Sequence, residues 1–350
     1  MKLTFRWYGK NDPVTLDKIR QIPQMSGIVS AVYDVAPGKV WSESSILEIK
    51  EMAQANGLEF EVVESVPVPE EIKYGAPNSD ELIENYCENI RRLGKVGVKC
   101  VCYNFMPVFD WLRSELEHQN TDGSNSLAYN EEQVLAMDPE KTSLSLPGWD
   151  ESYTKEELSR LIKIYKEIGE EGLWKNLEKF LKKVIPVASE AGVNMAIHPD
   201  DPPWGIFGLP RIITCEENID RFLQIVPDNA NGITLCTGSL GASTDNDLVK
   251  MAKKYAKRVH FLHLRNIKIV GKREFYEVAH PSECGSLDML EIVKALVQNG
   301  FDGYVRPDHG RMIWNESGKY GYGLFDRALG ATYIVGLFEA VEKMLGDINK

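Results

Sequence analysis

The segment VHFLHLRN at residues 259–266 is a short β-rich run, and seven further runs of this kind occur along the chain. Helical patterns separate the runs, as in residues 43–57 and 79–97, and each of these ends in glycine, the usual left-handed stop of a helix. Strands that alternate with helices predict a parallel sheet. The other expected strands are KLTFRW (2–7), GIVSAVYD (27–34), LEFEVVES (58–65), VKCVCYNF (98–105), VNMAIHP (193–199), GITLCTGS (232–239) and GYVRPDHG (303–310).

Eight such strand–helix units in a chain of 350 residues favour a closed (β/α)8 TIM barrel over a doubly wound sheet. No GxGxxG motif follows the first expected strand, which further weakens the dinucleotide-binding alternative. A long helical pattern over residues 154–192 precedes the fifth strand. We therefore expect an α/β protein with a single catalytic barrel domain over residues 1–350.

Two insertions interrupt this alternation, one after the fourth strand and one after the seventh. Residues 107–152 are rich in Asn, Ser, Asp and Gly, and the segment KIVGKREFYEVAHPSECGS occupies residues 268–286. Long loops in a compact domain usually carry function. We expect the first insertion to be a lid or a dimer contact.

Composition excludes several classes of partner. The net charge of −12, from 52 acidic and 40 basic residues, repels phosphate backbones and anionic headgroups, so we expect neither nucleic acid nor membrane as a partner. The first residues, MKLTFRWYGK, contain no apolar run typical of an export signal, which favours a cytoplasmic protein. The six cysteines form no CxxC pair and are expected to be reduced.

Potential metal ligands stand at the ends of four consecutive expected strands. In a TIM barrel the reactive side chains lie at the carboxyl ends of the strands, so these residues should converge on one site. On softness alone, two imidazoles, a thiolate and a carboxylate suit zinc best, with iron(II) next. The four residues are His198, Cys236, His263 and Asp308.

The alternation of side chains along a strand refines this choice. Residues two apart share a face, so His263 points inward with Arg265, while His260 points outward. The same rule groups Arg306 with Asp308, and His198 with Asp200 just beyond the fifth expected strand. We expect Arg265 and Arg306 to clamp a carboxylate near the metal.

Further residues in the same loops are candidates for catalysis or substrate binding. His309 follows Asp308 and is the expected acid–base group, with Tyr322 as its partner and Tyr320 as the rival of Tyr322. In the segment HPDDPPWG, Asp200 and Trp204 are expected substrate contacts, with Asp201 as a further candidate. The residues expected to be structural are Cys100, Cys102, Cys215, Cys284 and His118.

Several of these segments together resemble the mannonate dehydratase family from the first strand to the last helix. The segments are AIHPDDPPWGIFGLPRI (196–212), LCTGSLG (235–241), HLRN (263–266), RPDHGR (306–311) and the opening RWYG at Arg6. The resemblance implies a xylose-isomerase-like barrel that dehydrates D-mannonate to 2-dehydro-3-deoxy-D-gluconate in hexuronate (glucuronate) breakdown. It also implies one Mn²⁺ or Fe²⁺ per chain in place of zinc, held by the four residues named above.

Other functions remain open at this point. A metal-dependent sugar isomerase of the same superfamily shares the barrel and its acid–base chemistry. A barrel endonuclease acting on DNA lesions conflicts with the negative net charge, and a sugar-binding protein needs no metal with an open position. Acidic barrels with long loops often pair, so we expect a homodimer. The sequence leaves open the metal, the order of acid and base, and the choice among sugar-acid epimers.

Overall fold

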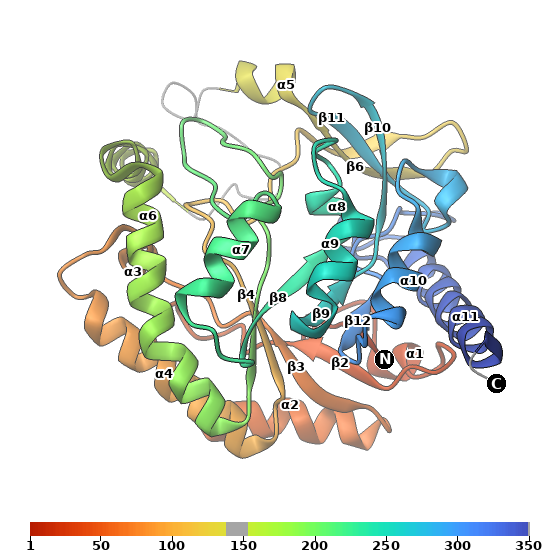
Figure 1. The fold of residues 1–350 in the computed structure, drawn as a ribbon, viewed down its shortest axis with the longest axis horizontal. Helices are drawn as coiled ribbons and strands as arrows, with labels where there is room; N and C mark the ends of the chain where they lie inside the picture. The colour runs from red at the N-terminus through yellow and green to blue at the C-terminus, as the bar shows by residue number, and fades with distance from the viewer. Residues whose placement is uncertain (138–152, 349–350) are drawn as a thin grey trace.

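Eight parallel strands close into a barrel in the computed structural model, which describes residues 1–137 and 153–348 (Figure 1). The spatial order is β1-β12-β9-β8-β7-β4-β3-β2, so each strand lies beside its neighbours in the chain once the strands of the insertions are set aside. This confirms the predicted (β/α)8 barrel. The strands are β1 (Lys2–Arg6), β2 (Gly27–Ser30), β3 (Glu59–Glu64), β4 (Cys100–Tyr103), β7 (Asn194–Ile197), β8 (Asn231–Cys236), β9 (Val259–His263) and β12 (Tyr304–Arg306).

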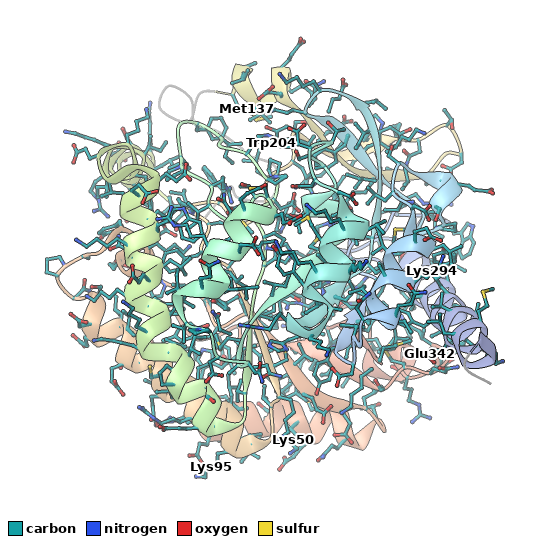
Figure 2. The ribbon with its side chains drawn as sticks, viewed as in Figure 1. Lys50, Lys95, Met137, Trp204, Lys294 and Glu342 are labelled. Carbon is teal, nitrogen blue, oxygen red and sulfur yellow. The ribbon has the colours of Figure 1, made fainter. Side chains whose placement is uncertain are left out.

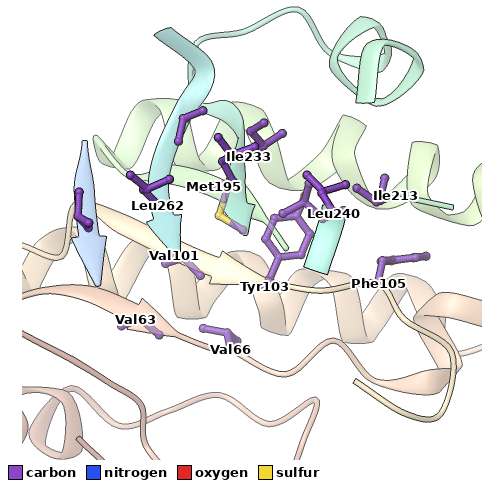
Figure 3. Close-up of a cluster of buried hydrophobic side chains, with 14 of the residues drawn as sticks. Val63, Val66, Val101, Tyr103, Phe105, Met195, Ile213, Ile233, Leu240 and Leu262 are labelled. Carbon is purple, nitrogen blue, oxygen red and sulfur yellow. The ribbon is translucent and has the colours of Figure 1, made fainter. Parts of the chain in front are cut away.

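Alternate residues of each strand point to the two sides of the barrel wall. A small cluster that includes Cys100, Cys102 and Phe261 fills the interior. Residues one position away, such as Val101 and Leu262, pack outward against the helices (Figure 3). Because the strands are buried on both faces, they read in the sequence as nearly continuous apolar runs.

Helices cover the outside of the barrel. The longest, α6, begins with a capping box in which Thr154 and Glu157 bond each other's backbone, and it is kinked at Gly169. The kink arises because Gly169 leaves the helical region, with φ 60° and ψ −170°. The helices are α1 (Leu16–Ile19), α2 (Glu43–Ala55), α3 (Glu70–Tyr74), α4 (Ser79–Val96), α5 (Glu131–Ala136), α6 (Lys155–Ala191), α7 (Glu216–Ile225), α8 (Thr237–Leu240), α9 (Leu248–Tyr255), α10 (Met289–Gln298) and α11 (Phe325–Ile348).

The two insertions form one structure, which the sequence did not reveal. Strands β5 (Glu115–Gln119) and β6 (Asn125–Asn130) of the first insertion join β10 (Asn266–Gly271) and β11 (Glu274–Val278) of the second. They make a four-stranded antiparallel sheet in the order β10-β11-β6-β5, here called the accessory sheet. It lies at the top of the molecule in Figure 1. Residues 138–152 of the predicted lid fall outside the described residues.

The described part of the chain contains no helix with the length and apolar character needed to cross a membrane.

The contact between α4 and α6 generates a stability prediction. A Cβ added at Gly94 would lie 2.5 Å from the carbonyl oxygen of Ala191, so Gly94→Ala must push the end of α6 away from α4. We expect a loss of about 1–3 kcal/mol in the free energy of unfolding. The matched control is Gly336→Ala in α11, where a Cβ meets nothing within 4 Å, and which should gain up to about 1 kcal/mol. Chemical denaturation measures both, and equal midpoints for the two variants would contradict the packing argument.

Candidate active site

Three of the predicted metal ligands converge at the carboxyl ends of adjacent strands. Cys236 and His263 are the last residues of β8 and β9, and His198 directly follows β7. Each offers one ligand atom, and these atoms all lie within 4.8 Å of one another. Cys236 and His263 are fully buried, and the rings of His198 and His263 lie 5.0 Å apart.

The fourth predicted ligand, Asp308, borders this group. Its carboxylate oxygens lie 3.6 Å from Cys236 Sγ and 3.7 Å from His263 Nδ1. One oxygen also accepts a hydrogen bond from Arg265 Nε at 2.6 Å, and the other forms an ion pair with Arg306 at 2.9 Å. Burial alone would raise the pKa of Asp308, but the positive charge around it holds that pKa well below its ordinary value.

The donor set and one unpartnered atom fit a divalent metal ion. His263 Nε2 accepts a hydrogen bond from Arg306 Nε at 2.9 Å, whereas His263 Nδ1 is buried and has no hydrogen-bond partner. A buried polar atom without a partner is unfavourable unless something binds it. Two imidazoles and a thiolate beside a carboxylate are suitable ligands for a transition metal.

Next to these residues, His309 and Tyr322 form a hydrogen-bonded pair. The His309 Nε2 atom lies 2.8 Å from the Tyr322 hydroxyl, and both side chains are more than nine-tenths buried. Tyr8 packs edge-on against Tyr322, with ring centroids 5.1 Å apart. Burial raises the pKa of Tyr322 well above its ordinary value, so the hydroxyl keeps its proton in this structure.

Its rival Tyr320 has a different environment. Tyr320 lines the cavity but is 39% exposed, and the nearby carboxylate of Glu117 raises the pKa of its hydroxyl. Of the two tyrosines, it is Tyr322 that hydrogen-bonds His309. Geometry therefore favours Tyr322 as the partner of His309.

A cavity of about 380 Å³ is lined by His198 and Asp308 of the ligand group and by the His309–Tyr322 pair. It is large enough for a six-carbon sugar acid, and residues from β1, β3, the loops after β7 and β12, and the first insertion contribute to its wall. The cavity wall includes Arg6, Glu64, Trp111, His198, Asp201, Arg306, Asp308, His309, Lys319 and Tyr322.

The two predicted carboxylate-binding arginines lie at different depths. Arg306 lines the cavity, and its Nη1 atom is buried without a partner, so it has a donor to offer a ligand. Arg265 does not line the cavity. Its three nitrogens contact Asp308, Glu277 and Asp201 at 2.6, 2.9 and 2.6 Å. Its role as a substrate contact stays a prediction, and in this structure its guanidinium supports Asp308.

Asp200 and Trp204, the other expected substrate contacts, also lie away from the cavity wall. Asp200 is 2% exposed, accepts a bond from the Ile213 backbone at 2.7 Å and pairs with Arg211. Trp204 donates to the Tyr129 hydroxyl at 3.0 Å and lies at the end of the molecule that carries the accessory sheet (Figure 2). Both stabilise the loop after β7, and it is Asp201 that reaches the cavity.

Several site residues were not predicted from the sequence. Glu64, the last residue of β3, pairs with Arg306 at 2.9 Å and is close to Arg6. Arg113 of the first insertion is fully buried and binds both oxygens of Asp201. Glu277 of β11 lies 2.8 Å from His309 Nδ1. Glu277 shares a strand face with buried Phe275. A carboxylate on an otherwise apolar strand face is visible in the sequence and could have marked Glu277 as a candidate.

Three of the residues set aside in the sequence belong to the framework of the barrel. Cys100 and Cys102 belong to the barrel interior, and His260 points outward to bond the Asn229 carbonyl. Cys102 also lies in a second group that could hold a metal, with Glu64 and His263. In that group Arg306 bonds both Glu64 and His263, so a guanidinium already supplies the positive charge.

Comparison with known proteins identifies the family. The family model described as D-mannonate dehydratase (UxuA) matches residues 1–347. The chain belongs to this family. Its members are hydro-lyases that dehydrate D-mannonate, which agrees with the resemblance of the strand-end segments.

Individual relatives agree over nearly the whole chain. The chain is 53% identical to a mannonate dehydratase of Streptococcus uberis over 345 residues, which is 98% of this chain and 99% of the relative. It is 54% identical to one from Oceanobacillus iheyensis over 342 residues, 98% of each. The crystal structure of mannonate dehydratase from Streptococcus suis serotype 2 is 50% identical, with a TM-score of 0.91 over 99% of this chain and 95% of that one.

More distant structures share the fold alone. A D-psicose 3-epimerase from Clostridium cellulolyticum is 15% identical, with a TM-score of 0.58 over 97% of this chain and 99% of that one.

The ligand cluster generates a prediction about metal content. Cys236→Ser replaces a thiolate donor with a hydroxyl, a much poorer ligand for a transition metal, so the variant should retain less manganese than the parent after loading and dialysis. The control is Cys87→Ser on α4, a buried thiol far from the cluster whose pKa burial raises to about 11. Elemental analysis gives the metal per chain. An unchanged stoichiometry in Cys236→Ser would contradict the assignment of Cys236 as a ligand.

Proposed function

We propose that this chain converts D-mannonate to 2-dehydro-3-deoxy-D-gluconate with one divalent ion, Mn²⁺ or Fe²⁺, in cytoplasmic glucuronate breakdown. The observation that carries the proposal is that one cavity is lined both by His198 of the His198–Cys236–His263 group and by the hydrogen-bonded pair His309–Tyr322. Family membership supplies the reaction. The geometry suggests which residues perform it.

His198, Cys236, His263 and Asp308 would hold the metal. When bound, such an ion acts as a Lewis acid toward the substrate carboxylate and C2 hydroxyl, and so stabilises the negative charge that develops when the C2 proton leaves. The charge of the site suits an anionic substrate. Arg306 has a free donor on the cavity wall, and the ammonium of Lys319 lies 4.0 Å from the centre of the Tyr8 ring at the same cavity.

His309 and Tyr322 would move the two protons of the reaction. Dehydration removes the C2 proton and expels the C3 hydroxyl, which must be protonated as it leaves. His309 Nε2 and the Tyr322 hydroxyl share a hydrogen bond in the structure, so one proton can pass between them without solvent. Trp111 packs edge-on against the His309 ring and helps to exclude water from the pair.

The described part of the first insertion supports its proposed role as a lid, since Trp111 belongs both to the insertion and to the cavity wall. The homodimer stays a prediction, for which sedimentation of the purified chain is the measurement.

Removing and restoring the metal tests the reaction. Protein stripped with EDTA should give no 2-keto-3-deoxy acid from D-mannonate, and adding back manganese or iron(II) should restore product to a greater extent than zinc. Higher activity with manganese or iron(II) would agree with the metal that the family resemblance implies. Higher activity with zinc would agree with the metal that the softness of the ligands favours. Folded protein that forms no product with any metal would contradict the proposal, and an aldose–ketose interconversion would favour the sugar isomerase.

Substitutions of the proton-transfer pair test the residue roles. His309→Asn and Tyr322→Phe should each lower kcat by about 100-fold to 10,000-fold, because each removes a proton-transfer group. Bound manganese should stay at the parental level in both variants. The comparison variant is Tyr320→Phe, which removes the hydroxyl of the rival tyrosine and should reduce kcat far less. A larger loss in Tyr320→Phe than in Tyr322→Phe would reverse the assignment.

A further inference from the structure

Glu277 stands behind the catalytic histidine without touching the cavity. It lies on β11 of the accessory sheet and is 1% exposed. One of its oxygens, Oε1, accepts from His309 Nδ1 at 2.8 Å, from Arg265 at 2.9 Å and from Arg113 at 3.0 Å. We propose that Glu277 is a positioning residue for dehydration, holding His309 in one orientation and one tautomer. This inference rests on the proposed function of His309.

The hydrogen bonds on the two sides of the imidazole determine which nitrogen carries the proton. A neutral imidazole has one donor and one acceptor nitrogen, and an ionised carboxylate only accepts. Nδ1 therefore donates to Glu277, which leaves the lone pair of Nε2 facing the Tyr322 hydroxyl at 2.8 Å. With the tautomer reversed, Nδ1 and the carboxylate would be two acceptors in contact. Glu277 thus presents Nε2 as the atom that accepts a proton.

The groups around Glu277 keep it ionised. Burial alone would raise its pKa, but His309, Arg265 and Arg113 hold that pKa below its ordinary value. A fixed negative charge at Nδ1 stabilises the imidazolium formed when His309 takes up a proton, as an aspartate does in serine protease triads. The accessory sheet therefore supplies part of the proton-transfer machinery, in addition to covering the barrel.

The alternative is that Glu277 only neutralises the two arginines. Each of them has another carboxylate partner, however, because Arg113 binds both oxygens of Asp201 and Arg265 binds Asp201 and Asp308. The contact with His309 is the one that this alternative leaves unexplained.

Glu277→Gln tests the proposal because it keeps the shape and the accepting Oε1 while removing the charge. We expect kcat to fall by about 100-fold or more, within the range that a positioned acid–base group contributes. KM and bound manganese should stay at the parental level. The matched control is Glu274→Gln, a half-buried carboxylate on the same strand that bonds Asn130, which should retain the parental kcat. A parental kcat in Glu277→Gln would overturn the proposal.

A double-mutant cycle separates positioning from a purely structural role. If Glu277 acts through His309, then Glu277→Gln combined with His309→Asn should be no slower than His309→Asn alone. If the losses in kcat of the two single variants multiply in the double variant, then Glu277 acts independently of His309, and the proposal is overturned. Should Glu277→Gln fail to fold, Glu277→Asp keeps the charge but withdraws it from Nδ1, and a parental kcat there would overturn the proposal equally.

Failure of the proposed function gives a different result. Parent protein without activity on D-mannonate would remove the reaction itself, whereas an active parent with an equally active Glu277→Gln would remove only the role of Glu277.

Discussion

The site depends on the contacts that the guanidinium of Arg265 makes with three carboxylates. Its three nitrogens bind Asp308, Glu277 and Asp201, which come from the loop after β12, the accessory sheet and the loop after β7. Burying charges costs several kcal/mol per ion, and removing one member of a buried pair is strongly destabilising because its partner is left uncompensated. Three separate segments are thus held in one arrangement by a side chain that need not contact the substrate.

Asp308 is constrained further by its backbone. It adopts φ 59°, in the left-handed region that residues with side chains seldom occupy. This conformation turns the carboxylate toward Cys236 and His263, and the bonds from Arg265 and Arg306 hold it there. Such strain persists only where the surrounding structure compensates for it, and it gathers at functional sites.

The sequence predicted the barrel and the strand-end ligands because both follow from local periodicity. Seven of the eight barrel strands lie within the expected runs, and β8 begins one residue before its run, at Asn231. The alternation correctly separated inward His263 from outward His260. The rule failed beyond the strand ends. In the loop after β7 it favoured Asp200, whereas Asp201 reaches the cavity, because side-chain alternation no longer applies once the backbone leaves the sheet. The role of Glu277 escaped prediction because two of its partners, His309 and Arg113, lie 32 and 164 positions away in the chain.

The accessory sheet has a consequence for how the chain folds. Its central contact joins β6 and β11, where Asn130 and Glu274 are bonded across 144 positions, so the hairpin of β5 and β6 is made long before its partner during synthesis. Until β11 arrives, β6 presents an unpaired edge to any other extended chain nearby. The accessory sheet therefore cannot close until β11 has been synthesised, and during that interval newly made chains are exposed to misassociation along β6.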